Sequence, residues 1–300
     1  NYLTMYFLKA SRKFIIAPIL FLYLLQVTPV HAQNKNIAGV SAQRLSRLEK
    51  FIQSEISAGK IPGAVTLIIR NNEVVHQGAY GYKNAAEKIP AGQQDLFFIQ
   101  SMTKPVITVA FMMLYEEGHF MLNDPISKYL PEFKNVRVLK NQNAGINGPT
   151  DSLQSQMTIA QILSHSSGLV HGLGQSNFEK EFRKAYFDPK FTDIQSRASA
   201  ITKYPLACQP GTAWNYSMGP DILSMLIEKF SGMSTRDFLM TRIFKPLGMN
   251  DTDYNVSAAN QNRIFKLHNK GEGTPITLSA NQPKSTGVTL WSGVNGLFTS

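Results

Sequence analysis

A serine followed three residues later by a lysine opens a long apolar run in this chain. The sequence Ser-Met-Thr-Lys at 101–104 precedes Pro105 and the apolar residues 106–114, a run long enough for a buried helix. Helical positions i and i+3 share one face, so the Ser101 hydroxyl can reach the Lys104 amine. Proline fits only near a helix start, because its ring opposes the carbonyl four residues back. The pattern predicts a nucleophile and its activator at the first turn of a central helix.

Ser57 and Lys60 have the same spacing, so spacing alone does not identify a site. Ser57 closes an amphipathic segment and is followed by Gly59 and Pro62, both of which stop helices. No helix continues beyond this lysine, whereas the helix predicted after Ser101 does continue. A helix cap and a solvated lysine remain the structural alternative for the pair at 101 and 104.

Residues 1–32 have the pattern of a secretory signal. Three basic residues precede the apolar stretch 14–27, and Val-His-Ala at 30–32 places small residues at the two key positions before a cut. The stretch is shorter than the roughly 20 residues that span a bilayer, so no membrane span is expected after cleavage. The sequence predicts an exported protein whose single domain covers residues 33–300.

Charge and cysteine content narrow the possible partners. The formal net charge of +10 falls to +7 without the signal, and the basic residues are scattered outside any nucleic-acid motif, so no nucleic acid is expected. Cys208 is the only cysteine, which forbids an internal disulfide and, for an exported chain, favours a bacterial periplasmic or secreted protein. The six histidines form neither His-Glu-x-x-His nor His-x-His, so no metal or cofactor is expected.

The order of predicted elements indicates an α+β fold. A helix capped by Ser41 precedes the β-rich runs 64–69 and 73–79, which Asn71-Asn72 can join as a tight hairpin. Helical patterns dominate from 101 to 248 and then fade into loops and short strand-like pieces. We expect further strands after the helical block, because a lone hairpin is only marginally stable.

A serine nucleophile needs a second group that takes its proton, since a free lysine with a pKa of about 10.4 is protonated at neutral pH. Tyr216 follows the Pro-Gly turn at 210–211 and lies just before a predicted helix. Either Tyr216 is the base and Lys104 holds it charged, or Lys104 is neutral and is itself the base. From these residues alone, a structural role in the core or a loop is the stronger interpretation of Tyr216.

Six short stretches together carry a family pattern. They are Ser-Met-Thr-Lys-Pro at 101–105, Glu-Gly-His-Phe-Met-Leu-Asn-Asp-Pro-Ile-Ser-Lys-Tyr-Leu-Pro at 117–131, Ile-Leu-Ser-His-Ser-Ser-Gly-Leu at 162–169, Pro-Gly through Tyr-Ser at 210–217, Pro-Leu-Gly-Met at 246–249, and Gly-Val-Asn-Gly-Leu at 293–297. The chain thereby resembles the serine β-lactamase-related family, which contains class C β-lactamases, D-Ala-D-Ala carboxypeptidases and esterases on the same fold.

The resemblance implies a β-lactamase/transpeptidase-like fold, in which an antiparallel sheet is flanked by helices and a large helical subdomain. It also implies an acyl-enzyme on Ser101, with Lys104 and Tyr216 as the proton-transfer pair. A Ser-His-Asp triad of Ser101, His165 and Asp124 is rejected, because the chain contains no Gly-x-Ser-x-Gly elbow.

Two departures from the family pattern change these expectations. Where the family commonly has Tyr-x-Asn, this chain has Tyr216-Ser217-Met218, so we expect Met218 to bind substrate through a less polar surface. The family's third motif, Lys/His-x-Gly on a strand, has not appeared when the chain stops at 299–300. We therefore expect a chain truncated before its C-terminal strands, without one of two oxyanion donors.

These observations predict an exported serine hydrolase that acts on carboxylic esters or on β-lactam and D-amino-acid amides. The expected partner is a small ester or amide, with a cell-wall peptide as a further candidate. The alternative is a non-hydrolysing penicillin-binding or sensor-type domain that acylates once and stays acylated.

Overall fold

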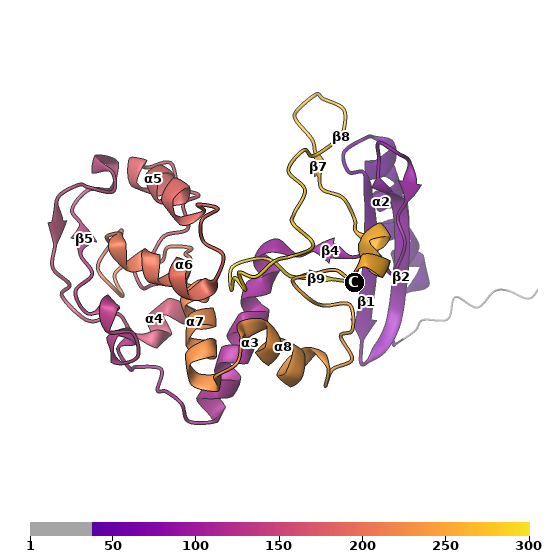
Figure 1. Ribbon diagram of the computed structural model, residues 1–300. Helices are drawn as coiled ribbons and strands as arrows, with labels where there is room; N and C mark the ends of the chain where they lie inside the picture. Colours follow the sequence, from indigo (N-terminus) through magenta and orange to yellow (C-terminus); the bar gives the residue numbers. More distant parts are fainter. Residues whose placement is uncertain (1–37) are drawn as a thin grey trace, which may run out of the picture.

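A strand-rich part and a helix-rich part lie on opposite sides of the central helix α3 (Thr103–Glu116), as Figure 1 shows. The computed structural model describes residues 38–300, so the predicted signal at 1–32 lies outside the described residues. The other helices are α2 (Ala42–Ser57), α4 (Ile159–Leu163), α5 (Asn177–Tyr186), α6 (Ile194–Ala200), α7 (Gly219–Ser231) and α8 (Thr235–Leu239). The strands are β1 (Gly63–Arg70), β2 (Glu73–Asn84), β3 (Ile89–Pro90), β4 (Phe97–Phe98), β5 (Val138–Leu139), β6 (Thr150–Asp151), β7 (His268–Asn269), β8 (Thr277–Leu278) and β9 (Phe298–Thr299).

The predicted helix and hairpin are confirmed at the N-terminal end of the described chain. The Ser41 hydroxyl caps α2, and β1 pairs antiparallel with β2. Asn71 and Asn72 join the strands with φ angles of 52° and 61°, which a two-residue hairpin turn requires. The strand β2 runs past the predicted end at 79, because its last residues also pair with β3.

The apolar run after the Ser-x-x-Lys motif forms α3 and becomes the centre of the core. Ile107 and Phe111 are fully buried on it, while Val109 faces solvent. Gly118 ends the helix with a φ angle of 80°, a conformation that glycine adopts without strain. Because one side of α3 is packed against other helices, the helix holds the start of the motif rigidly.

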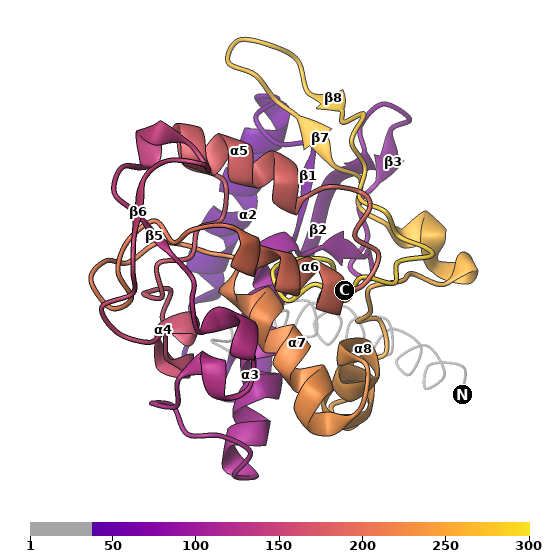
Figure 2. The same ribbon diagram turned by 60° about the vertical axis from the view of Figure 1, so that its left-hand side comes forward.

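The helix α7 is buried along most of its length and packs beside α3, and Figure 2 shows the two helices side by side. Pro220 stands in its first turn, where the missing N–H of proline has no cost. Earlier in the helical block, Thr158 and Gln161 cap the start of α4 reciprocally in a capping box. These local signals place the helix starts that surround the motif.

Strands follow the helical block, as expected, but within residues 38–300 they form separate pairs. β9 pairs antiparallel with β4 and β7 with β8, while the three-stranded sheet keeps the order β1-β2-β3. The pairing with β9 places the C-terminal segment beside β4, directly before the motif. None of the helices in this range is both long and apolar enough to cross a membrane.

We expect Ile107→Ala to lower the free energy of unfolding by about 2–5 kcal/mol, because it leaves a cavity in a fully buried site. Val109→Ala on the same helix is the matched control, and its side chain is 55% exposed. Its effect should stay within about 0.5 kcal/mol. Urea unfolding of both variants checks this, and equal losses would contradict the assigned core face of α3.

Candidate functional site

The structure brings Ser101 and Lys104 together at the start of α3. Ser101 lies in a 3-10 turn, Gln100–Met102, that leads into the helix, and Lys104 Nζ is 3.1 Å from Ser101 Oγ. Ser101 is exposed, whereas Lys104 is only 7% exposed. Gln100 has a φ angle of 46°, an uncommon value for a residue other than glycine. The hydroxyl is thus open to a substrate and its lysine is shielded from water.

A backbone carbonyl from the far end of the chain fixes the other side of this lysine. Lys104 Nζ donates a hydrogen bond of 3.0 Å to the carbonyl oxygen of Val294. The same segment is tied to the start of α3, because the N–H of Leu297 bonds Thr103 Oγ1 and the N–H of Ile99 bonds the Leu297 carbonyl. The segment 292–297 therefore acts as a backbone wall behind Lys104.

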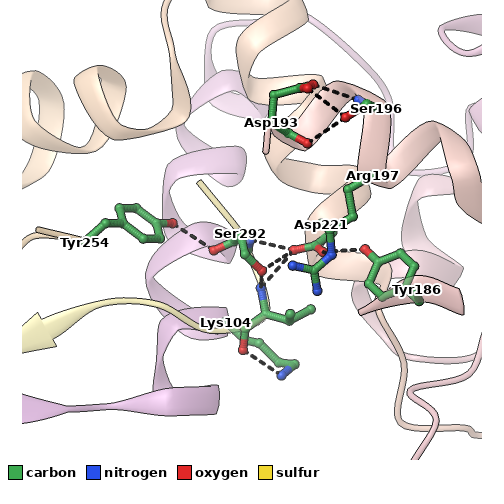
Figure 3. A network of polar contacts seen from close by, with 10 residues as sticks. Lys104, Tyr186, Asp193, Ser196, Arg197, Asp221, Tyr254 and Ser292 are labelled. Atoms are coloured by element: carbon green, nitrogen blue, oxygen red, sulfur yellow. Dashed lines mark hydrogen bonds and ion pairs between the residues drawn. The ribbon is translucent and has the colours of Figure 1, made fainter. Parts of the chain in front are cut away.

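Asp221 holds this backbone wall in place, as Figure 3 shows. Its Oδ1 accepts hydrogen bonds from the Ser292 hydroxyl at 2.7 Å, from the N–H of Gly293 at 2.7 Å and from the N–H of Val294 at 3.2 Å. Tyr254 adds a bond from its hydroxyl to the Ser292 carbonyl. One carboxylate oxygen thus orders three consecutive residues, the last of which presents its carbonyl to Lys104.

The second carboxylate oxygen of Asp221, Oδ2, has a cation and a phenol as its partners. Arg197 Nε lies 3.4 Å from Oδ2, and the Tyr186 hydroxyl donates to the same oxygen. Burial, followed by the nearby Asp221 charge, raises the pKa of Tyr186 well above its usual value, so this phenol stays protonated and donates. A carboxylate with no exposed surface needs such partners, because desolvation of an unpaired charge is costly.

Tyr216 reaches the same place from the loop before α7. Lys104 Nζ lies 4.6 Å from the centre of the Tyr216 ring. The His171 ring stacks on Tyr216 at 5.0 Å with an interplanar angle of 20°, and the His165 ring lies at 5.0 Å and 44°. The three side chains predicted to form a proton-transfer site, at 101, 104 and 216, therefore meet in one place.

His165 belongs to the Tyr216 surroundings and not to a Ser-His-Asp triad. Its Nδ1 accepts from the N–H of Ser217 at 3.2 Å. Burial and the Lys104 charge lower the pKa of His165, which keeps its ring neutral at neutral pH. Asp124 instead accepts bonds from the hydroxyl of Tyr129 and from neighbouring residues, which hold its pKa at about 2.

Two further sequence expectations concern Met218 and the second Ser-x-x-Lys pair. Met218 has no exposed surface and packs in the main core, and its N–H bonds the Val170 carbonyl. The expectation that Met218 binds substrate is therefore wrong, because its side chain is fully buried in the core and has no surface that a substrate could contact. In the alternative Ser-x-x-Lys pair, Lys60 forms an ion pair with Glu55.

Sequence reasoning missed the residues that support the site. Asp221 stands in the first turn of α7, where an acidic residue is explained as a helix-dipole partner. Its signal was an acidic residue within a segment that is otherwise almost wholly apolar. His171 carried no motif signal. Among residues 38–300, no group of three or more His, Cys, Asp or Glu side chains is arranged to hold a metal ion.

The chain belongs to the Beta-lactamase family, because the sequence pattern of that family matches residues 48–296. Protein Rv1367c of Mycobacterium tuberculosis is 31% identical over 222 residues, which cover 74% of this chain and 54% of that protein. Esterase EstB of Burkholderia gladioli is 26% identical over 242 residues, covering 79% of this chain and 58% of that protein. The chain thus spans a little over half the length of these relatives.

A solved structure shows the same fold. EstCE1, described as a hydrolase with promiscuous acyltransferase activity, superposes with a TM-score of 0.71 at 20% identity. The match covers 85% of this chain and 69% of that one. This likeness confirms the predicted α+β, β-lactamase/transpeptidase-like fold, with its strands and its large helical part.

Asp221→Asn should lower the free energy of unfolding by about 3–5 kcal/mol and reduce the reactivity of Ser101. An amide at this position turns an N–H donor toward Arg197 and Tyr186, and leaves the guanidinium without its counter-ion. Urea unfolding and the rate of Ser101 labelling measure the two effects.

Asp193→Asn is the matched control, because Asp193 only caps α6 on the surface, a role that asparagine fills equally well. Its stability should change by less than about 1 kcal/mol. A mild Asp221→Asn phenotype, similar to that of the control, would show that the carboxylate does not organise the segment behind Lys104.

Proposed function

We propose that this protein is an exported serine hydrolase that forms an acyl-enzyme on Ser101 and transfers the acyl group to water. The observation that carries the proposal is the meeting of Ser101, Lys104 and Tyr216, with the lysine amine 3.1 Å from the serine oxygen. Relatives with the name esterase support the hydrolytic class. The predicted signal at 1–32 supports a periplasmic or secreted location.

The contacts of Lys104 suggest how the proton moves. Its amine faces Ser101 Oγ, the Val294 carbonyl and the face of the Tyr216 ring, three electron-rich partners that suit an ammonium donor. We therefore assign Tyr216 as the base that takes the Ser101 proton, with Lys104 orienting both groups. Neutral Lys104 as the base is the alternative, and then the Val294 carbonyl fixes one of its N–H bonds.

The acylation step follows from these roles. In this scheme Lys104 holds Tyr216 as a phenolate. Ser101 Oγ attacks the substrate carbonyl while its proton passes to the phenolate oxygen, and a tetrahedral oxyanion forms beside the start of α3. The positive end of the helix dipole stabilises this oxyanion. When the intermediate collapses, the proton is donated to the leaving alcohol and an ester with Ser101 remains. Water then repeats the sequence and releases the acid.

We propose carboxylic esters as the preferred substrates, over acylamino compounds such as β-lactams and D-amino-acid amides. The position at which the family commonly carries asparagine holds Met218, so the amide that would hydrogen-bond an acylamino side chain is absent from this chain. Met218 itself is buried and takes no part in binding. A cell-wall peptide is a further candidate for the partner. A D-Ala-D-Ala peptide tested beside short esters separates these substrates.

Intact-mass spectrometry after exposure to a fluorophosphonate tests the nucleophile. The wild type should gain one adduct, and Ser101→Ala should gain none. Ser57→Ala is the matched control, because Ser57 has the same spacing to a lysine yet lies at the end of α2, and its lysine pairs with Glu55. Its adduct should remain. An adduct that survives in Ser101→Ala would exclude Ser101 as the reactive serine.

Turnover separates hydrolysis from single acylation. A p-nitrophenyl ester should be hydrolysed over many cycles and at a higher kcat/KM than a cephalosporin. A burst of product equal to the enzyme concentration, followed by no further release, would instead indicate the non-hydrolysing sensor type. Turnover of the cephalosporin alone would overturn the ester assignment.

A further inference from the structure

The orientation of the Tyr216 ring depends on ring packing. Within residues 38–300, no hydrogen bond to a protein group ties down its hydroxyl, so the plane of the ring is set by its neighbours. His171 stacks on it nearly parallel, and Trp214 lies 6.4 Å away from it. The centre of the Phe187 ring lies 6.3 Å from that of His171, with an interplanar angle of 49°. His171 thus connects the proposed base to the helical part of the protein.

His171 is a costly choice for a packing residue. Its Nδ1 is buried and has no hydrogen-bond partner among the described residues, a situation that destabilises a fold. A phenylalanine would stack without this cost, so packing stability alone does not explain the residue. A residue that lowers the stability of a fold, such as one with a buried unpaired polar atom, is expected mainly at functional sites.

The electrostatic surroundings keep the His171 ring neutral. Burial, followed by the positive charge of Lys104, lowers its pKa to about 4. Arg183 and His165 act in the same direction, and Asp221 acts in the opposite one. Above about pH 5 the ring therefore stacks on Tyr216 without placing a second cation beside Lys104.

We propose that His171 is a positioning residue for Tyr216. Its neutral imidazole packs against both Phe187 and Tyr216 and fixes the plane of the tyrosine ring, so that the hydroxyl faces Ser101 during proton transfer. The inference rests on the proposed role of Tyr216 as a proton-transfer group. A small displacement of such a group can reduce a rate by up to about a hundredfold, so loss of the stack should act on catalysis.

The kinetic test compares His171→Ala with His171→Phe. The alanine variant should lose about 10- to 100-fold in kcat for a p-nitrophenyl ester, with little change in KM, because the substrate still binds. The phenylalanine variant keeps the stacked ring and should recover most of kcat.

His119→Ala is the matched control. The His119 ring also stacks on an aromatic ring, Phe230, at 5.7 Å and 24°, but at the far end of α3. Its kcat should equal that of the wild type. An unchanged kcat in His171→Ala, or a loss in His171→Phe as large as in His171→Ala, would overturn the positioning role.

A second measurement reads the ring cluster without catalysis. The chain contains two tryptophans, so Trp291→Phe leaves Trp214, beside Tyr216, as the single emitter. In this background His171→Ala should lower the anisotropy of Trp214 emission and its near-UV circular dichroism, and His171→Phe should preserve both. Unchanged signals in His171→Ala would overturn the proposal. An inactive wild type would count against the proposed function alone, because the Trp214 signals still test the stack.

Discussion

The candidate site depends on one buried carboxylate. Asp221 lies in the first turn of α7 with no exposed surface, and its Oδ1 receives hydrogen bonds from three consecutive residues, 292–294. Burial of this charge would be prohibitive without Arg197 and Tyr186 on the other oxygen. The buried carboxylate thereby fixes the position of this segment, which presents the Val294 carbonyl to Lys104. The amine beside Ser101 is thus placed by a residue that does not touch it.

The approach of this segment to α7 leaves no room for a side chain. A Cβ on Gly293 would lie 2.0 Å from the Pro220 carbonyl oxygen, a backbone atom that cannot move aside. Pro220 in turn fixes the start of α7. The glycine in the Gly-Val-Asn-Gly-Leu stretch is therefore explained by close packing. The nucleophile sits where three distant segments meet, at the starts of α3 and α7 and beside residues 292–297.

The sequence predicts what local rules determine and misses what long-range contacts determine. The i, i+3 spacing predicted the Ser101–Lys104 pair, and Asn71 and Asn72 predicted the hairpin turn. Both predictions depend only on residues that are close in the sequence. Met218 was misjudged because spacing from Tyr216 does not reveal which way a side chain points. The role of Asp221 could not be predicted, since its hydrogen-bond donors come from residues some seventy positions later.

The two proposed proton-transfer groups share one support. Asp221 orders the backbone that holds Lys104, and its partner Arg197 packs with its guanidinium 5.0 Å from the Phe187 ring centre. Phe187 contacts His171, which stacks on Tyr216. The contacts that hold Lys104 and the contacts that hold Tyr216 therefore both start from the buried Asp221–Arg197 ion pair. Substitutions in these two sets of contacts affect residues that are in contact with one another. Their free-energy effects are therefore not expected to be additive.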